Sequence, residues 1–180
     1  MRKLSILGGL ILFAAVPAMA QDYPKGEVGG NYTYVRINPG GGLSGQNCQG
    51  GGGSVAGNLN HYFGVAGEFS GCKWTGLPSG LSAHTFAYLF GPRLTYRTHG
   101  RFEPFAEALF GGAHASATAS GTTVTDNAFA MAIGGGADYK FSRSLAIRLI
   151  QADYLFTKFG STHQNNVRIQ AGIVFRFGGR

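Results

Sequence analysis

The sequence predicts an all-β protein, an eight-stranded antiparallel up-and-down β-barrel that crosses a membrane. Eight segments alternate between apolar and small or polar residues, and the connections between them alternate between short and long. Only 13% of the residues are charged, although 31 are glycine and no long apolar run follows the start of the chain. A soluble domain usually has about a quarter of its residues charged. Apolar residues dispersed with a period of two instead form strands with one apolar face.

The start of the chain has the pattern of an export signal. Two basic residues precede an uncharged, mostly apolar stretch from Leu4 to Val16, and Ala18–Ala20 forms a small-x-small cleavage site. The apolar stretch is too short to span a bilayer as a helix. We therefore expect residues 1–20 to be a signal peptide and residues 21–180 to form the barrel domain. Position 21 is not Cys, which argues against a lipid-anchored protein.

The last predicted strand has the clearest pattern. From Val167 to Phe177 the odd positions are all apolar, whereas the even positions include Arg168, Gln170 and Arg176. The segment has the length of a tilted membrane strand, and a helix would mix the two sets around its circumference. The same alternation predicts seven further strands, at residues 27–35, 52–59, 64–70, 85–96, 104–113, 128–139 and 145–156.

The pattern of residues 145–156 shifts phase between Ile150 and Asp153, which predicts a β-bulge. The short turns are expected at residues 60–62, 97–101 and 140–144, and the long loops at 38–50, 72–83, 115–126 and 158–165. Such an alternation is typical of outer-membrane barrels, which keep their short turns in the periplasm. The prediction therefore gives a protein of the cell outer membrane with both termini in the periplasm.

The predicted inner faces carry most of the charge. The residues concerned are Glu27, Glu68, Glu107, Asp138, Arg93, Arg148, Arg168 and Arg176, with Asp153 left undecided by the phase shift. An eight-stranded barrel is barely wide enough for its own side chains, so these groups are expected to pair by charge-assisted hydrogen bonds. The alternative is a narrow ion-conducting pore, although a wide aqueous channel needs about 16 strands. We expect neither a metal site nor a cofactor.

Aromatic residues gather near both ends of the predicted strands. One group is Tyr62, Phe63, Tyr96, Phe102, Tyr139, Phe141, Phe175 and Phe177, and the other is Tyr34, Trp74, Phe86, Phe129 and Phe156. Two such groups resemble the aromatic girdles at the two membrane interfaces. They favour a lipid-facing apolar wall over a soluble lipocalin-type barrel, which would turn its apolar face inward around a ligand.

The two cysteines, Cys48 and Cys72, are expected to form a disulfide, since an exported chain reaches an oxidising compartment. A hairpin centred near Asn60 would place opposite each other residues whose numbers sum to 120, as these two do. Facing Cα atoms lie about 4.5–5.5 Å apart, within the range of a disulfide. A turn of two or four residues would shift this register by one residue.

With these features, the chain resembles the OmpA-like and OmpX-like family of small outer-membrane barrels over residues 27–177. The resemblance rests on three motifs, Gly91–Tyr96, Gly134-Gly136-Asp138-Tyr139 and Ile173–Phe177. It implies that Phe175 and Phe177 form the aromatic signal read by the barrel assembly machinery, although three residues follow Phe177. The periplasmic peptidoglycan-binding domain of full OmpA proteins is absent from the sequence, so tethering to the cell wall is not expected.

The sequence favours a structural or surface-interaction protein, a monomer that acts in envelope integrity or through contacts of its surface loops. Its expected partners are outer-membrane lipid, lipopolysaccharide, the barrel assembly machinery and an extracellular ligand of unknown identity. The basic residues are scattered rather than clustered, which argues against nucleic-acid binding.

The alternative from another class is a lipid A hydrolase, because some eight-stranded barrels are enzymes that act on lipid A. The candidate residues are His114, Ser116 and Asp126, in which the His would activate the Ser hydroxyl and the carboxylate would orient the His. Ser116 begins a low-complexity stretch that is expected to form a flexible surface loop.

Overall fold

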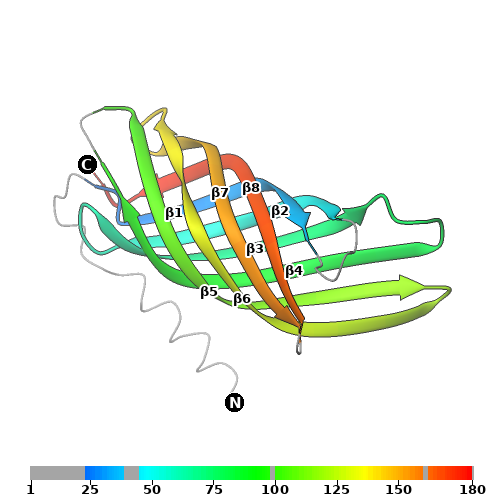
Figure 1. Cartoon of the computed structure of the whole chain (residues 1–180). Coiled ribbons are helices and arrows are strands. Elements are labelled where there is room, and N and C mark those ends of the chain that lie inside the picture. Colours follow the sequence, from blue (N-terminus) through cyan, green and yellow to red (C-terminus); the bar gives the residue numbers. More distant parts are fainter. Residues whose placement is uncertain (1–22, 39–44, 98–99, 160–161, 180) are drawn as a thin grey trace, which may run out of the picture.

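The computed structural model describes residues 23–38, 45–97, 100–159 and 162–179, so the predicted signal peptide lies outside the described residues. Eight strands form one closed antiparallel barrel in which each strand pairs with its sequence neighbours and the last pairs with the first (Figure 1). The strands are β1 (Gly26–Ile37), β2 (Gln46–Asn58), β3 (Phe63–Thr75), β4 (Leu81–Thr95), β5 (Phe102–Ala119), β6 (Thr122–Lys140), β7 (Leu145–Phe159) and β8 (Thr162–Phe177). The predicted fold class is confirmed.

Several predicted long loops are wrong, because the strands continue through them. β5 runs to Ala119 and β6 begins at Thr122, so most of the expected loop 115–126 is paired strand. Ser120 and Gly121 both have positive φ angles, of 48° and 82°, which is the backbone of a two-residue type I′ hairpin turn. The ladder hydrogen bonds depend on the backbone alone, so a stretch of Ala, Ser and Thr pairs as well as an apolar one.

The other expected loops shrink in the same way. β3 and β4 leave only residues 76–80 between them, β2 already begins at Gln46, and β7 and β8 extend into the segment 158–165. Residues 39–44 and 160–161 lie outside the described part of the chain. As Figure 1 shows, β4, β5 and β6 extend beyond the other strands at one end of the barrel. We call this the hairpin end, and the opposite end, where Gly26 and Phe177 pair, the terminal end.

The predicted β-bulge is present in β7. The register shifts against β6 between Ala137 and Asp138 and against β8 between Arg148 and Gln151. Leu149 and Ile150 are consecutive, yet both face outward, with 49% and 51% of their surface exposed. The extra residue restores the inward phase, so the side chains that follow at positions 151 and 153 are buried.

The outer wall of the barrel is apolar. Large side chains are about half exposed along it, including Phe69, Phe90, Phe110, Ile133 and Ile173. At the terminal end the exposed aromatic residues are Tyr62, Tyr96, Phe102, Phe141, Phe175 and Phe177. The described residues contain no apolar helix that is long enough to cross a bilayer.

Trp74 does not belong to the girdle in which the sequence placed it. It shares the inward phase of Glu68 and Cys72 on β3, and its indole packs against the buried apolar cluster of the interior. The indole Nε1 donates a hydrogen bond of 2.9 Å to the hydroxyl of Thr85. The prediction was wrong because it used closeness to a strand end and ignored the alternation of faces.

Candidate functional site: the barrel interior

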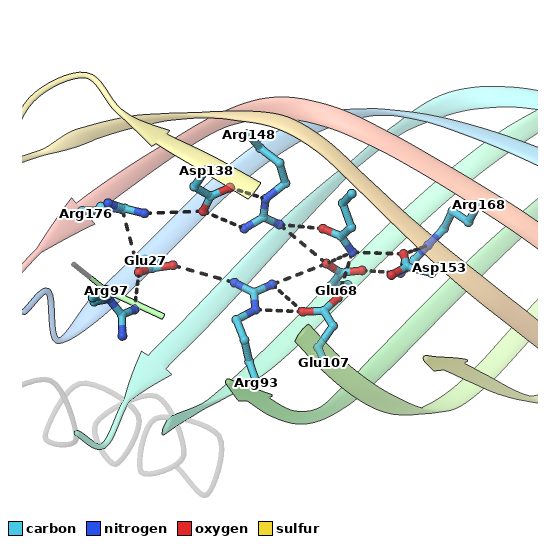
Figure 2. Close-up of polar contacts among 11 residues, drawn as sticks. Glu27, Glu68, Arg93, Arg97, Glu107, Asp138, Arg148, Asp153, Arg168 and Arg176 are labelled. Atoms are coloured by element: carbon cyan, nitrogen blue, oxygen red, sulfur yellow. Dashed lines mark hydrogen bonds and ion pairs between the residues drawn. The ribbon is translucent and has the colours of Figure 1, made fainter. Parts of the chain in front are cut away.

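The half of the interior toward the terminal end is filled by charged side chains, which we call the ionic plug. Its buried members among the described residues are Glu27, Glu68, Glu103, Glu107, Asp138, Asp153, Arg93, Arg97, Arg148, Arg168 and Arg176. All except Glu103 are labelled in Figure 2, where dashed lines join them into a continuous network along the barrel. Every strand except β2 contributes to the plug, because alternate side chains of a strand point to the same face, and Arg97 lies just beyond the end of β4.

At the terminal end of the plug, Glu27 is surrounded by arginines. Its carboxylate lies 3.0 Å from Arg97, 3.7 Å from Arg93 and 3.9 Å from Arg176. Arg176 also contacts Glu103 at 2.8 Å. Since Glu27 and Arg176 face each other across the β1–β8 pair, this contact joins the first strand to the last.

In the middle of the plug, Glu68 contacts guanidinium groups from three strands. It pairs with Arg168 of β8 and lies 3.6 Å from Arg93 and 3.8 Å from Arg148. Two of these arginines have a nearer carboxylate, because Arg93 contacts Glu107 at 2.8 Å and Arg148 contacts Asp138 at 2.9 Å. Further along the plug, Arg168 also contacts Asp153 at 2.7 Å. Pairing of this kind offsets the large cost of removing charge from water.

Gln151 connects the acidic members of the plug. Its Nε2 lies 2.8 Å from Glu107, 3.0 Å from Glu68 and 3.0 Å from Asp153, while its Oε1 accepts a hydrogen bond of 2.9 Å from Arg148. The oxygens of the three carboxylates lie within 4.8 Å of one another, a spacing that could suit a metal ion. The amide nitrogen is already in contact with all three, so this cluster gives no independent sign of a metal.

One aromatic ring contacts two of the arginines. The guanidinium carbons of Arg93 and Arg148 lie 4.8 Å and 4.5 Å from the centroid of the Phe105 ring. Cation–π contacts of this geometry are more favourable in a desolvated site than at the surface. Phe105 therefore contributes a favourable contact to each of these two buried charges.

All eight charged residues that the sequence assigned to the interior lie there, as does Asp153, which the sequence left undecided. Sequence reasoning missed Arg97, Glu103 and Gln151. Arg97 and Glu103 lie just beyond the predicted strand ends, although each has the parity of an inward residue on its strand, Arg93 and Glu107 respectively. Gln151 follows the bulge, where strict alternation gives the wrong face.

The half of the interior toward the hairpin end carries mostly small and apolar side chains, together with buried Ser70, Thr157 and Asn166, so the paired charges that the sequence predicts fill only the other half. Its buried apolar members are Val35, Ile37, Cys48, Leu89, Leu109, Ala113, Ala128, Ala130, Ala132 and Leu155. Above this layer a cavity of about 380 Å³ opens among β3 to β8 and the end of β1. The sequence pattern indicates that these positions carry small or inward-facing side chains, but it does not predict a cavity.

The predicted disulfide between Cys48 and Cys72 is confirmed and lies beside this apolar layer, with Cα atoms 5.4 Å apart. The predicted register is wrong. Cys48 faces Trp74 and Cys72 faces Gly50, so facing residues of this hairpin sum to 122 and the bond joins diagonal neighbours. The turn begins at Leu59 and is centred on His61, because Asn60 Oδ1 accepts the backbone N–H groups of Tyr62 and Phe63, each at 2.8 Å.

The hydrolase candidates do not form the arrangement that their chemistry requires. His114 Nδ1 lies 2.9 Å from Asn127 Oδ1, and the Asp126 carboxylate accepts the backbone N–H of Asn127. Asp126 faces Ala115 in the β5–β6 ladder, so it projects to the face opposite His114 and Ser116. No His–carboxylate contact links these three residues.

Comparison with solved structures finds the same fold in small outer-membrane barrels. Neisserial surface protein A superposes with a TM-score of 0.71 at 13% identity, over 85% of this chain and 97% of that one. Ail, the attachment invasion locus protein of Yersinia pestis, gives 0.59 at 18% identity, over 86% and 99%. The N-terminal barrel of Pseudomonas aeruginosa OprF gives 0.51 at 15% identity, over 88% and 100%.

A search of curated proteins found no match to the sequence. The profile of the outer membrane protein beta-barrel domain family matches residues 7–177, which is nearly the whole chain. With the closed eight-stranded barrel, its apolar outer wall and its buried ionic interior, the chain belongs to the outer membrane protein beta-barrel domain family and is a protein of the outer membrane.

Proposed function

We propose that this protein is a surface-interaction barrel that binds the phosphate groups of lipopolysaccharide and thereby supports the integrity of the envelope. In this proposal both termini are periplasmic, and the hairpin end faces the exterior. The observation that carries it is the segregation of charge between the inside and the outside of the barrel. All the described carboxylates except Asp126 are buried inside the barrel, so the cations on its outer surface are left almost uncompensated.

The cations near the hairpin end face outward. They are Arg36 on β1, Lys73 on β3 and Lys158 on β7, all exposed. Arg36 is held in place by a hydrogen bond of 2.6 Å to Asn47 Oδ1. Side chains at this level of an outer-membrane barrel lie beside the phosphorylated sugars of the outer leaflet, and each basic residue near an anionic membrane surface contributes about 1 kcal/mol of binding free energy.

Replacing Arg36, Lys73 and Lys158 together with Ala should remove most of the binding to lipopolysaccharide. Three basic residues correspond to about 3 kcal/mol at low salt, which is roughly 100-fold in affinity. Since a ligand of the folded state raises thermal stability, the readout is the shift that lipopolysaccharide causes in the midpoint of heat-induced gel-mobility change. The purified protein would be studied in zwitterionic detergent.

The matched control replaces three cations of the terminal end, Lys25, Arg101 and Arg143, with Ala. This variant should keep the full shift, because these residues lie at the other rim. Equal shifts in the two triple variants would overturn the lipopolysaccharide proposal, because they would show that the shift depends only on the net charge of the protein. A repeat with heparin, a soluble polyanion, shows whether the cations need a membrane ligand. Heparin is chosen because Ail has been solved in complex with the heparin analogue sucrose octasulfate.

The proposed orientation can be tested with epitope insertions in two tight turns. An epitope between Ser120 and Gly121, at the β5–β6 turn, should bind antibody on intact cells. The same epitope between Ser142 and Arg143, at the β6–β7 turn, should bind antibody only after the outer membrane is permeabilised. Exposed tips of this kind tolerate insertion well. The reverse pattern of labelling would invert the orientation.

The other two functions have less support. The ionic plug fills the inner cross-section with paired side chains, which does not favour a conducting path. The hydrolase would need Asp126 to move to the other face of the sheet, because its register opposite Ala115 keeps it away from His114.

A further inference from the structure

The apolar cavity at the hairpin end is not used by the proposed lipopolysaccharide contact, whose cations face outward. Its volume of about 380 Å³ falls within the range of small-molecule sites, about 300–1,000 Å³. The inner faces of several strands line it, with Trp74 and Ala87 on one side and Ala113, Ala115 and Leu155 on others. Because the wall residues are small, the space between the strands remains open rather than filled by side chains.

The cavity is closed on the side of the ionic plug. Leu89 and Leu109 are fully buried in the apolar layer between the cavity and the plug. A ligand would therefore enter from the hairpin end and stop at an apolar floor. A blind apolar pocket with one open end suits a flexible hydrocarbon chain, since burial of each CH₂ group is favourable and needs no polar partner.

The charge at the opening restricts the head group. Among the residues that the structure describes, Asp126 is the only carboxylate that lines the cavity, and neither Lys nor Arg lines it. One carboxylate oxygen of Asp126 accepts the backbone N–H of Asn127 at 2.8 Å, and the other makes no hydrogen bond among the described residues. Asp126 is exposed, so its negative charge faces the solvent at the opening. A cationic head group is complementary to this carboxylate, and an anionic one is repelled.

We propose that the cavity binds an amphiphile with a single alkyl chain and an ammonium head group. The chain lies in the cavity between Trp74 and the small side chains of β4 and β5, and the head group lies at Asp126. This site differs from the lipopolysaccharide surface in its charge, its location and its hydrocarbon content, so either can fail without the other.

The single Trp of the chain provides a direct reporter, because Trp74 lines the cavity. The probe is an n-alkyltrimethylammonium ion with a bromine at the end of its chain, added to the folded protein in phospholipid nanodiscs below its micelle concentration. Bromine within the cavity should quench the Trp74 fluorescence. Affinity should rise about fourfold for each added methylene until the cavity is full.

Partition of the probe into the bilayer depends on chain length in the same way as binding in the cavity. A pair of matched variants therefore distinguishes binding in the cavity from partition into the bilayer. Ala115→Phe fills the cavity and should abolish the saturable quenching. Ala106→Phe places the same ring on the outer face of the same strand and should leave the quenching unchanged. Equal quenching in both variants would show entry from the bilayer and would overturn the proposal.

A third variant tests the head group. Asp126→Asn should weaken binding of the ammonium probe about threefold, as expected for an exposed ion pair. It should leave unchanged the binding of an uncharged bromoalkanol of the same length. An alkyl sulfate probe should bind the native protein more weakly than the alkanol does. Tighter binding of the sulfate would overturn the assignment of a cationic ligand.

Discussion

Replacing Glu68 with Ala should lower the free energy of unfolding by about 3–5 kcal/mol, the largest effect that we expect from any single substitution. The carboxylate is buried and lies in contact with Arg93, Arg148 and Arg168, so its loss leaves positive charge in the barrel without its central counter-charge. The measurement is urea-induced unfolding in phospholipid vesicles, followed by the gel mobility of the folded barrel.

Two further variants test whether the lost charge of Glu68 causes the loss of stability. Glu68→Gln keeps the shape and a hydrogen-bonding group, so its cost isolates the lost charge and should be smaller than that of Glu68→Ala. Asp126→Ala removes an exposed carboxylate and should change the stability by less than about 0.5 kcal/mol. If Glu68→Ala were as stable as Asp126→Ala, the ionic plug would not stabilise the barrel.

Loss of the disulfide should have the second largest effect. Replacing Cys48 and Cys72 together with Ala should lower the free energy of unfolding by about 3 kcal/mol, because their sequence separation of 24 residues closes a loop of moderate length in the unfolded chain. Urea titration of the oxidised native protein and of the double variant gives the difference.

A reducing agent provides the internal control for that experiment. It should lower the stability of the native protein to nearly that of the double variant and should leave the double variant unchanged. A native protein that was insensitive to reductant after full unfolding would show that the bond does not form. The Trp74 fluorescence should respond to reduction as well, since the disulfide and the indole pack against the same apolar cluster.

The sequence predicts the side on which each residue lies better than it predicts where each strand ends. Alternation placed Arg168 and Glu107 inside the barrel because a period of two leaves only two faces to choose from. The ends of β5 and β6 could not be found in this way. Residues 115–126 carry little contrast between faces, yet their backbones pair as fully as any others.

The interior network could be predicted in its composition but not in its contacts. Parity identifies Arg93 and Glu68 as inward, but which carboxylate an arginine contacts depends on barrel closure and on the stagger between strands. The inward position of Gln151 could not be predicted for a further reason. The bulge at Leu149 and Ile150 changes the phase, and its precise position depends on the register with both neighbouring strands.

The β1–β8 contact between Glu27 and Arg176 has a consequence for the order in which the molecule assembles. In an open sheet in the membrane, the charged faces of the strands would face hydrocarbon, and Arg176 of β8 would lie away from Glu27 of β1, although Arg168 would keep Asp153 of the neighbouring β7. Arg168 would still lack Glu68 of β3, and Arg176 would also lack Glu103 of β5, both on strands made earlier in the chain. These contacts form only when the last strand meets the first, so closure of the seam completes the neutralisation of charge and is coupled to stable insertion into the membrane. The terminal segment supplies the final counter-charges that make the inserted state stable.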